Sequence, residues 1–356
     1  MHPKEAKEMK KLCFASDYQE GAHPAVMNRL LETNLEQSPG YGTDEYCESA
    51  RERIRTACAC PGAAVHFLAG GTQANAVVIG ALLRSHQGVI AAESGHINGH
   101  EAGAVEHGGH KLLTLPHREG KLSADAIRDF CEGYRNDASR EYIVMPGVVY
   151  ISQPTELGTL YSLHELTAIH EVCREFGIPL YIDGARLAYA LACNAGDVSL
   201  PALARCCDVF YIGGTKCGAL FGEAVVIPDP GLLPYFTTVI KQHGALLAKG
   251  RILGVQFDAL FTDGLYERVG APAIDAADRL REALAGMGIP LRYESPANQL
   301  FPVLDNRAAA LLEEKVLFHR WERADEAHTV IRLVTSWATA PADTEALIAV
   351  LREIKQ

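Results

Sequence analysis

The 356-residue sequence contains no run of basic residues, no cysteine pair at metal-site spacing and no uninterrupted apolar segment long enough to span a membrane. It has 33 Lys and Arg against 44 Asp and Glu, and the resulting charge of −11 disfavours a nucleic-acid partner. Its ten cysteines include no CxxC pair, which argues against a zinc ribbon and, at this length, against a disulfide scaffold. We therefore expect reduced cysteines in a cytoplasmic protein, where they act as small hydrophobic residues.

A charge-free stretch runs from Thr56 to Leu83, but Pro61, several glycines and polar side chains interrupt it. Such a segment cannot cross a bilayer as one apolar helix, so no membrane association is expected. The charged N-terminal sequence MHPKEAKEMKK also lacks the apolar segment of a secretory signal. Hydrophobic residues at 48% and charged residues at 22% indicate a globular chain, and its length favours two domains.

Short apolar runs alternate with helical patterns between Ala64 and about Ile227. The candidate strands are 64–70, 88–93, 142–152, 179–183, 209–213 and 223–228. The clearest helix follows Ser162, which stands at capping-box spacing from Glu165, and it is expected to end at Gly177. The alternation predicts an α/β fold whose mostly parallel sheet carries helices on both faces.

The pattern changes after Gly250. Long helical stretches, at about 253–286 and 307–324, flank shorter strand candidates at 291–295, 298–305 and 329–337, and a last helix begins near Thr344. This region predicts a smaller C-terminal α+β domain. We expect residues 1–252 to form an N-terminal arm and a large domain, and residues 253–356 to form the small domain.

Ligands of open α/β sheets bind at the carboxyl ends of the strands, so the residues that follow each strand are the first candidates for a site. Gly71 and Thr72 open a helix after the first strand, and free N–H groups with a hydroxyl suit a phosphate, although tight packing alone also explains such a turn. Asp183 ends another strand and Arg186 follows it. This carboxylate can hold a ring nitrogen, a metal or the nearby arginine.

Lys216 lies in GGTKCG, directly after the candidate strand 209–213. Burying an unpaired ammonium group is costly, so such a lysine suggests an imine-forming amine or a lowered pKa, with a surface lysine as the alternative. His96 follows the strand 88–93 and can stack on a planar cofactor, act as a base or bind a metal with His100. Because HExxH and a third ligand are missing, no metal site is predicted.

A phosphate turn, a strand-end aspartate and a glycine-flanked lysine therefore occur in this order on an α/β chain. Pyridoxal phosphate needs these three anchors: a phosphate cradle, a partner for the pyridine nitrogen and a Schiff-base lysine. Each signal is weak alone, but their order and context together predict a site for this cofactor.

The sequence resembles the low-specificity L-threonine aldolases and the β-eliminating lyases, which are pyridoxal-phosphate enzymes with the aspartate-aminotransferase fold. The resemblance covers nearly the whole chain. Its motifs are FASDYQEGAHP (14–24), GGTQAN (70–75), SGHINGHEAGA (94–104), IDGARL (182–187), GGTKCG (213–218) and IRLVTSW (331–337).

This resemblance implies a role for each matching residue. Lys216 would bond the cofactor, Asp183 would keep its ring nitrogen protonated, and His96 would stack on its ring. The cofactor contacts would come from Gly71, Thr72, His96, Asp183, Arg186, Thr215 and Lys216. The substrate α-carboxylate would be held by Ser16, Arg186 and Arg332. Two arginines suit this role because a guanidinium group binds a carboxylate through two hydrogen bonds.

The resemblance also implies the reaction. We expect retro-aldol cleavage of L-threonine or L-allo-threonine, small amino-acid substrates, to glycine and an aldehyde, within amino-acid metabolism. His96, or a water that it orients, would remove the proton of the β-hydroxyl group. The alternative is β-elimination by the same cofactor on a substrate with a better leaving group. A cofactor-binding relative without enzyme activity is a third reading.

The chain departs from the family pattern in two segments. Gly213 stands where members usually carry a serine three residues before the lysine, and Thr215 would compensate at the phosphate. The loop GYGTDEY (40–46) replaces an acidic, glycine-rich form that lies near the site in the family.

A neighbouring subunit would supply a further phosphate ligand from Lys241, Lys249 or Arg251, unless these residues belong to an ordinary basic helix. We expect a homo-oligomer, a dimer or a homotetramer, with shared active sites.

Overall fold

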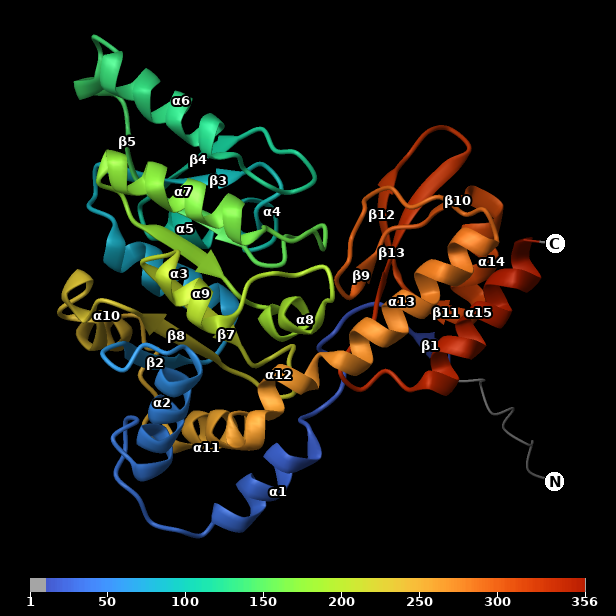
Figure 1. The fold of residues 1–356 in the computed structure, drawn as a ribbon, viewed down its shortest axis with the longest axis horizontal. Coiled ribbons are helices and arrows are strands. Elements are labelled where there is room, and N and C mark those ends of the chain that lie inside the picture. The colour runs from blue at the N-terminus through green and yellow to red at the C-terminus, as the bar shows by residue number, and fades with distance from the viewer. Residues whose placement is uncertain (1–10, 356) are drawn as a thin grey trace, which may run out of the picture.

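The computed structural model describes residues 11–355, which form a large lobe around a seven-stranded sheet and a smaller C-terminal lobe (Figure 1). The strands of the large sheet lie in the order β2-β8-β7-β6-β5-β3-β4. Their bounds are β2 Ala64–Leu68, β3 Gln87–Ala92, β4 Lys111–Leu115, β5 Met145–Ser152, β6 Leu180–Asp183, β7 Val209–Gly213 and β8 Glu223–Ile227. Strand β8 is antiparallel to both neighbours and the other pairs are parallel, which confirms the predicted mostly parallel sheet.

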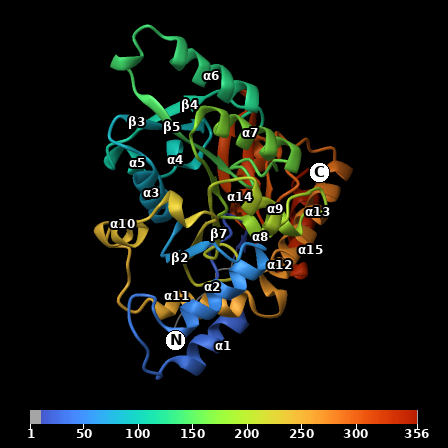
Figure 2. The ribbon, with the colours of Figure 1, turned by 60° about the vertical axis from the view of Figure 1, so that its left-hand side comes forward.

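Helices cover both faces of this sheet, as predicted. In Figure 2, α3, α5 and α10 lie on one side of it and α7, α8 and α9 on the other. The strands between them alternate strictly: Val149 and Ile151 of β5 join the core under one layer, whereas Val148 and Tyr150 join the core under the other. The helices of the large lobe are α1 Pro24–Thr33, α2 Glu45–Ala57, α3 Gly71–Leu82, α4 His96–Gly99, α5 Ala104–His107, α6 Ala124–Asn136, α7 Leu163–Phe176, α8 Leu187–Ala192, α9 Leu200–Arg205, α10 Phe236–Gln242, α11 Arg251–Leu260 and α12 Leu265–Val269.

Helix α7 shows how closely local chemistry sets an element. The Ser162 hydroxyl accepts a hydrogen bond from the Glu165 N–H at 3.2 Å, and the Glu165 carboxylate accepts one from the Ser162 N–H at 2.8 Å. Gly177 ends the helix in the left-handed conformation, with φ of 68°. The predicted capping box and the predicted end are both confirmed.

The small lobe packs α13 (Ala271–Gly286), α14 (Asn306–Lys315) and α15 (Pro341–Lys355) against a four-stranded sheet. The sheet consists of β9 Gln299–Leu300, β10 Val303–Asp305, β12 His319–Arg323 and β13 His328–Val334. Near the N-terminus, β1 (Leu12–Cys13) pairs with β11 (Val316–Leu317), so the N-terminal segment joins this lobe. The charged residues 1–10 lie outside the described chain.

Two helical predictions beyond Gly250 are wrong in part. The stretch 253–286 is broken after α11, because Asp263 and Gly264 have φ of 50° and 64° and interrupt the helix. In the stretch 307–324, the helix ends at Lys315, and 316–323 forms strands β11 and β12, whose residues pair with β1 and β13. Strand β4, at the edge of the large sheet, was not predicted. No helix within 11–355 is long and apolar enough to span a membrane.

Candidate active site

A cavity of about 290 Å³ lies where β7, β6, β5 and β3 end and where α3 begins. It brings together every residue that was predicted to contact the cofactor. These residues are Gly71, Thr72, His96, Asp183, Arg186, Thr215 and Lys216. The residues that the carboxyl-end rule selects therefore lie together in one cavity, although the strands that carry them are far apart in sequence.

Asp183 ends β6 and is held by four hydrogen-bond donors. Its Oδ2 accepts from Tyr150 at 2.7 Å and from Asn75 at 3.1 Å, and its Oδ1 accepts from Tyr211 at 2.5 Å and from the Ala185 N–H at 2.9 Å. Burial acts to raise the pKa of Asp183, but the charge of His96 and these hydrogen bonds outweigh it and hold the pKa below its usual value. The site therefore keeps a buried negative charge.

Lys216 follows β7 in a tight, glycine-rich turn. Burial and the positive charge of Arg186 lower the pKa of its amine, against the opposing charges of Asp17, Asp183 and Glu223. A lowered pKa increases the neutral fraction of the amine, the form that attacks a carbonyl. The Tyr189 hydroxyl donates to the Lys216 carbonyl and fixes the backbone of the turn.

The phosphate turn lies at the start of α3, where Gly70 is the N-cap. A Cβ on Gly71 would lie 3.1 Å from the Tyr211 hydroxyl, so glycine leaves room that a side chain would fill. Nearby, the Thr215 hydroxyl accepts from the Gly222 N–H at 3.0 Å, and Glu223 accepts from the Gly214 N–H at 3.0 Å. Burial raises the pKa of Glu223 to about 8, against the lowering effect of the Lys216 charge.

His96 is the first residue of α4 and is hydrogen-bonded to a buried carboxylate. Its Nδ1 lies 2.7 Å from Oε1 of Glu101, and Asn75 donates to the same oxygen at 2.7 Å. Asn75 also donates to Asp183, so it links the two carboxylates. The Nδ1 contact requires a proton on that nitrogen, which leaves Nε2 to face a ligand.

Arg186 binds Asp17 through two hydrogen bonds, of 2.7 and 3.1 Å, so part of its guanidinium group is already used inside the protein. Ser16, next to Asp17, has a buried hydroxyl without a partner, and Nε of Arg332 is likewise buried and unpaired among the described residues. Arg332 and Arg186 are close enough for each to affect the other's charge, and burial followed by Arg186 lowers the pKa of Arg332 to about 10. Ser16 and Arg332 lie beside the cavity but do not line it.

Several residues that interact at the candidate site were not predicted from the sequence. Asp17, Glu101, Tyr211 and Glu223 interact with the predicted residues, and Glu156 lines the cavity itself. Glu156 was within reach of the carboxyl-end rule, because QPTE directly follows the strand 142–152 that had been predicted. The partners Glu101 and Asp17 carry no local signal, since their roles depend on contacts across the fold.

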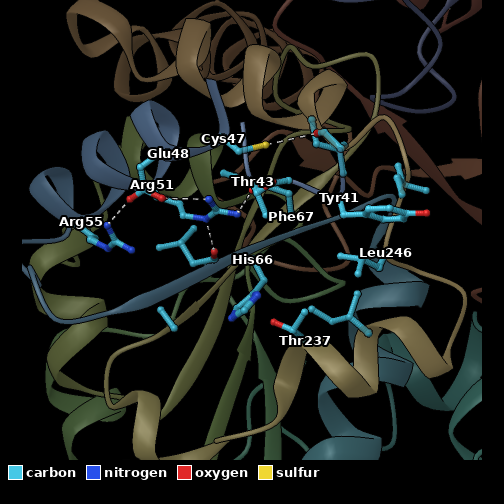
Figure 3. A pocket seen from close by; sticks show the side chains of 17 residues that line it. Tyr41, Thr43, Cys47, Glu48, Arg51, Arg55, His66, Phe67, Thr237 and Leu246 are labelled. Atoms are coloured by element: carbon cyan, nitrogen blue, oxygen red, sulfur yellow. Dashed lines mark hydrogen bonds and ion pairs between the residues drawn. The ribbon is translucent and has the colours of Figure 1, made fainter. Parts of the chain in front are cut away.

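A second cavity, of about 500 Å³, lies beside β2, between α2 and α10 (Figure 3). Its guanidinium groups are occupied within the protein: Arg51, for example, donates to the carbonyls of Gly42 and Val65 and pairs with Glu48. Tyr41, from the loop 40–46, lines this cavity rather than the one around Lys216. Lys241 lies over the Tyr41 ring, and Arg251 donates to the carbonyls of Glu36 and Thr33. Within one chain these residues are not brought to the site.

Comparison with known proteins connects this geometry to a family. The family model described as β-eliminating lyase matches residues 14–351. The chain belongs to the β-eliminating lyase family. It is therefore an enzyme, a lyase.

Relatives within and beyond the family agree with this assignment. The chain is 32% identical over 352 residues to a low specificity L-threonine aldolase of a Pseudomonas species, covering 96% of this chain and 97% of that protein. A solved threonine aldolase of Leishmania major is 40% identical, with a TM-score of 0.93 over 97% of this chain and 99% of that chain. Aspartate aminotransferase of Thermus thermophilus is 15% identical over 97% of this chain and 91% of its own, with a TM-score of 0.71, and confirms the fold.

Proposed function

We propose that this lyase is a pyridoxal-phosphate-dependent aldolase that cleaves L-threonine, L-allo-threonine and related β-hydroxy-α-amino acids to glycine and an aldehyde. The observation that carries the proposal is the single cavity that joins Lys216, Asp183 and the N-terminus of α3. The similarity to two proteins named as threonine aldolases, across nearly their full lengths, supports the substrate class.

The residues present fit this cofactor. Asp183 is a buried carboxylate with a lowered pKa that would hold a protonated pyridine nitrogen, and Lys216 is an amine with a lowered pKa. The first N–H groups of α3 and Thr72, which line the same cavity, suit a phosphate. The bound cofactor supplies an electron sink that stabilises negative charge at the substrate Cα.

The protein groups then have distinct tasks. Ser16, whose buried hydroxyl has no partner in the described chain, and Arg332, whose buried Nε has none, would bind the substrate carboxylate together with Arg186. Holding this carboxylate would orient the bonds at Cα and would so select which of them breaks. His96, with its tautomer set by Glu101, would pack against the ring. Lys216, an amine that lines the same cavity, would return a proton to Cα.

A β-elimination on the same cofactor is the competing function, and the two share every anchor residue. Product analysis separates them. The protein, reconstituted with pyridoxal phosphate, would be incubated with L-threonine, L-allo-threonine, phenylserine, serine and tyrosine. The proposal predicts glycine and an aldehyde in equal amounts from threonine and phenylserine. Ammonia and a keto acid as the main products would contradict aldol cleavage and favour elimination.

The assembly and location belong to the same proposal. We propose a homo-oligomer, a dimer or a homotetramer, in which Lys241, Lys249 or Arg251 of one subunit approaches the phosphate in another. Within one chain Lys241 and Arg251 are away from the cavity, so such a role requires a neighbour. A cytoplasmic location is consistent with ten cysteines that are all free.

A further inference from the structure

Glu156 lines the cavity of Lys216 but has none of the tasks described above. It follows β5 and is 9% exposed. Its Oε1 accepts hydrogen bonds from the His96 backbone N–H at 2.8 Å and from the Ser152 hydroxyl at 2.6 Å. These bonds hold the carboxyl group between the end of β5 and the start of α4. Within residues 11–355, no hydrogen bond from another residue reaches Oε2, so this oxygen remains for a ligand.

The other two carboxyl groups of the cavity are placed for different work. Asp183 already accepts four hydrogen bonds at the base of the site. Glu223 pairs in register with Leu68, beside the phosphate turn, and accepts from the Gly214 N–H. Glu156 instead lies near His96 and close enough to Arg186 to raise its pKa. It is therefore the carboxyl group on the side where the substrate carboxylate and the packed imidazole are expected.

We propose that Glu156 is the general base that takes the proton of the substrate β-hydroxyl group. This inference rests on the aldolase function proposed above. In the step, the β-hydroxyl O–H bond breaks and its proton moves to Oε2 of Glu156. The oxygen electron pair forms the aldehyde C=O bond while the Cα–Cβ bond breaks. The electron pair of that bond stays at Cα, which is later protonated to give glycine.

The electrostatics of Glu156 suit this task better than those of His96. Burial raises the pKa of Glu156, and Asp183 adds to the shift, while the hydrogen bonds from Ser152 and His96 oppose it. The other ionisable groups in its range are Arg186, Tyr150 and Tyr161. A carboxylate with a raised pKa is a stronger base than an ordinary glutamate. His96 has its Nδ1 bound to Glu101 and its ring expected against the cofactor.

The first test replaces Glu156 by glutamine, whose amide oxygen can still accept from His96 and Ser152. Glu156→Gln is expected to lower kcat for L-threonine by at least about 100-fold, the usual share of a general base. Its affinity for glycine, followed by the change in cofactor absorbance, should stay within about threefold, because glycine has no β-hydroxyl group. Glu93→Gln, in the exposed loop after β3, is the control and should change neither quantity.

The second test shifts the pKa of Glu156, the proposed base. The Ser152 hydroxyl holds the pKa of Glu156 down, so Ser152→Ala should raise it further. A base works only when deprotonated, so the acid limb of kcat/KM should move to higher pH in Ser152→Ala. In Glu156→Gln this limb should be lost. If Glu156 had a purely structural role, the acid limb would stay unchanged in both variants.

Two results would overturn the inference. One is a Glu156→Gln protein that cleaves threonine within about threefold of the wild-type rate. The other is an acid limb that stays unchanged in Ser152→Ala, a variant that keeps the carboxyl group and so reports even if glutamine disturbs the fold. Failure of the wild-type protein to release glycine from any β-hydroxy amino acid would instead refute the proposed function. This result is measured on the wild-type protein alone, so it is distinguishable from failure of the Glu156 inference.

Discussion

The carboxylate of Asp183 accepts four hydrogen bonds from its surroundings. Replacing it by asparagine keeps its size but removes the charge that four donors and His96 stabilise. Without this charge the cofactor ring is no longer kept protonated, so we expect Asp183→Asn to lower kcat by at least about 100-fold and to weaken cofactor binding. Steady-state kinetics and absorbance titration with pyridoxal phosphate measure the two effects. Asp129→Asn, exposed on α6, is the control; unchanged kinetics in Asp183→Asn would contradict the assignment.

The two arginines at the site should differ in their effect on stability. Arg186 pairs with Asp17, which is 1% exposed, so Arg186→Ala leaves a buried carboxylate without its partner. Loss of one partner of a buried pair costs about 3–5 kcal/mol of unfolding free energy. Arg332→Ala should cost much less, because Arg332 has no buried carboxylate partner, but it should raise KM for threonine, because its Nε is unpaired in the described chain and is proposed to bind substrate. Urea unfolding and kinetics separate the two effects; equal stability losses would contradict this account.

The Arg186–Asp17 pair should make the free energy of unfolding depend on pH. Burial acts to raise the pKa of Asp17, but Arg186, Lys216 and the hydrogen bonds of Arg186 and Asn298 outweigh it and lower the pKa. A carboxylate with a depressed pKa in the folded state stabilises the protein above its ordinary pKa, and this contribution is lost as the pH falls through the folded-state value. The stability difference between wild type and Arg186→Ala should therefore shrink in acid. A difference that grows in acid would contradict the pairing.

At the scale of elements, close packing between helices depends on single glycines. A Cβ on Gly254 of α11 would lie 2.6 Å from the backbone nitrogen of Cys47 in α2. Gly254→Ala should therefore force the helices apart and cost about 1–3 kcal/mol. Gly286, the last residue of α13, has open space around its Cα, so Gly286→Ala should be neutral or stabilise by up to about 1 kcal/mol. Urea midpoints test the pair; a stable Gly254→Ala would contradict the contact.

Elements with a strong local signal were predictable from sequence. Strand β7 and helix α7 have the predicted bounds to within a residue, because an apolar run and a capping box define them. Strands β11 and β12 were predicted as helix, since their residues follow a helical pattern and their pairing partners lie in β1 and β13, which no local window contains. The exposed edge strand β4 was missed for the same reason: its partner β3 is what makes it a strand.

The candidate site was predictable in part. Residues at or shortly after the end of a strand, such as Asp183 and Lys216, could be selected because sheet topology brings strand ends together. Their partners could not be predicted. The bond from His96 to Glu101 depends on how the turn after α4 folds back, and that from Arg186 to Asp17 joins residues on different elements. Reactive residues at strand ends follow a local sequence pattern, whereas the hydrogen-bonded partners that shift their pKa values do not.

For the whole molecule, the division into 1–252 and 253–356 stays a prediction that the core arrangement refines. Side chains of α11 and α12, and Ile274 of α13, join the core of the large lobe, whereas Ala277 and Leu280 join that of the small lobe. We therefore propose that the boundary lies within α13. Residues near the N-terminus, such as Phe14, belong to the small-lobe core, so both ends of the chain contribute to that lobe.

The proposed sharing of active sites between subunits predicts complementation. Lys216→Ala and Arg251→Ala proteins should each be nearly inactive if Arg251 serves the phosphate of a neighbour. When the two are co-expressed, a mixed dimer contains one site with both residues intact, so about a quarter of the wild-type activity should return. Activity of the purified mixture measures this. Full activity of Arg251→Ala alone, or no recovery in the mixture, would contradict the shared site.

The central claim is that Lys216 binds pyridoxal phosphate covalently in this cavity, and one measurement tests it directly. The protein would be incubated with pyridoxal phosphate, reduced with borohydride, digested and analysed by mass spectrometry. The account predicts one stoichiometric reduced adduct, on the peptide that contains Lys216, and its loss in Lys216→Ala. An adduct on another lysine, or a protein that acquires no reducible chromophore, would contradict the account.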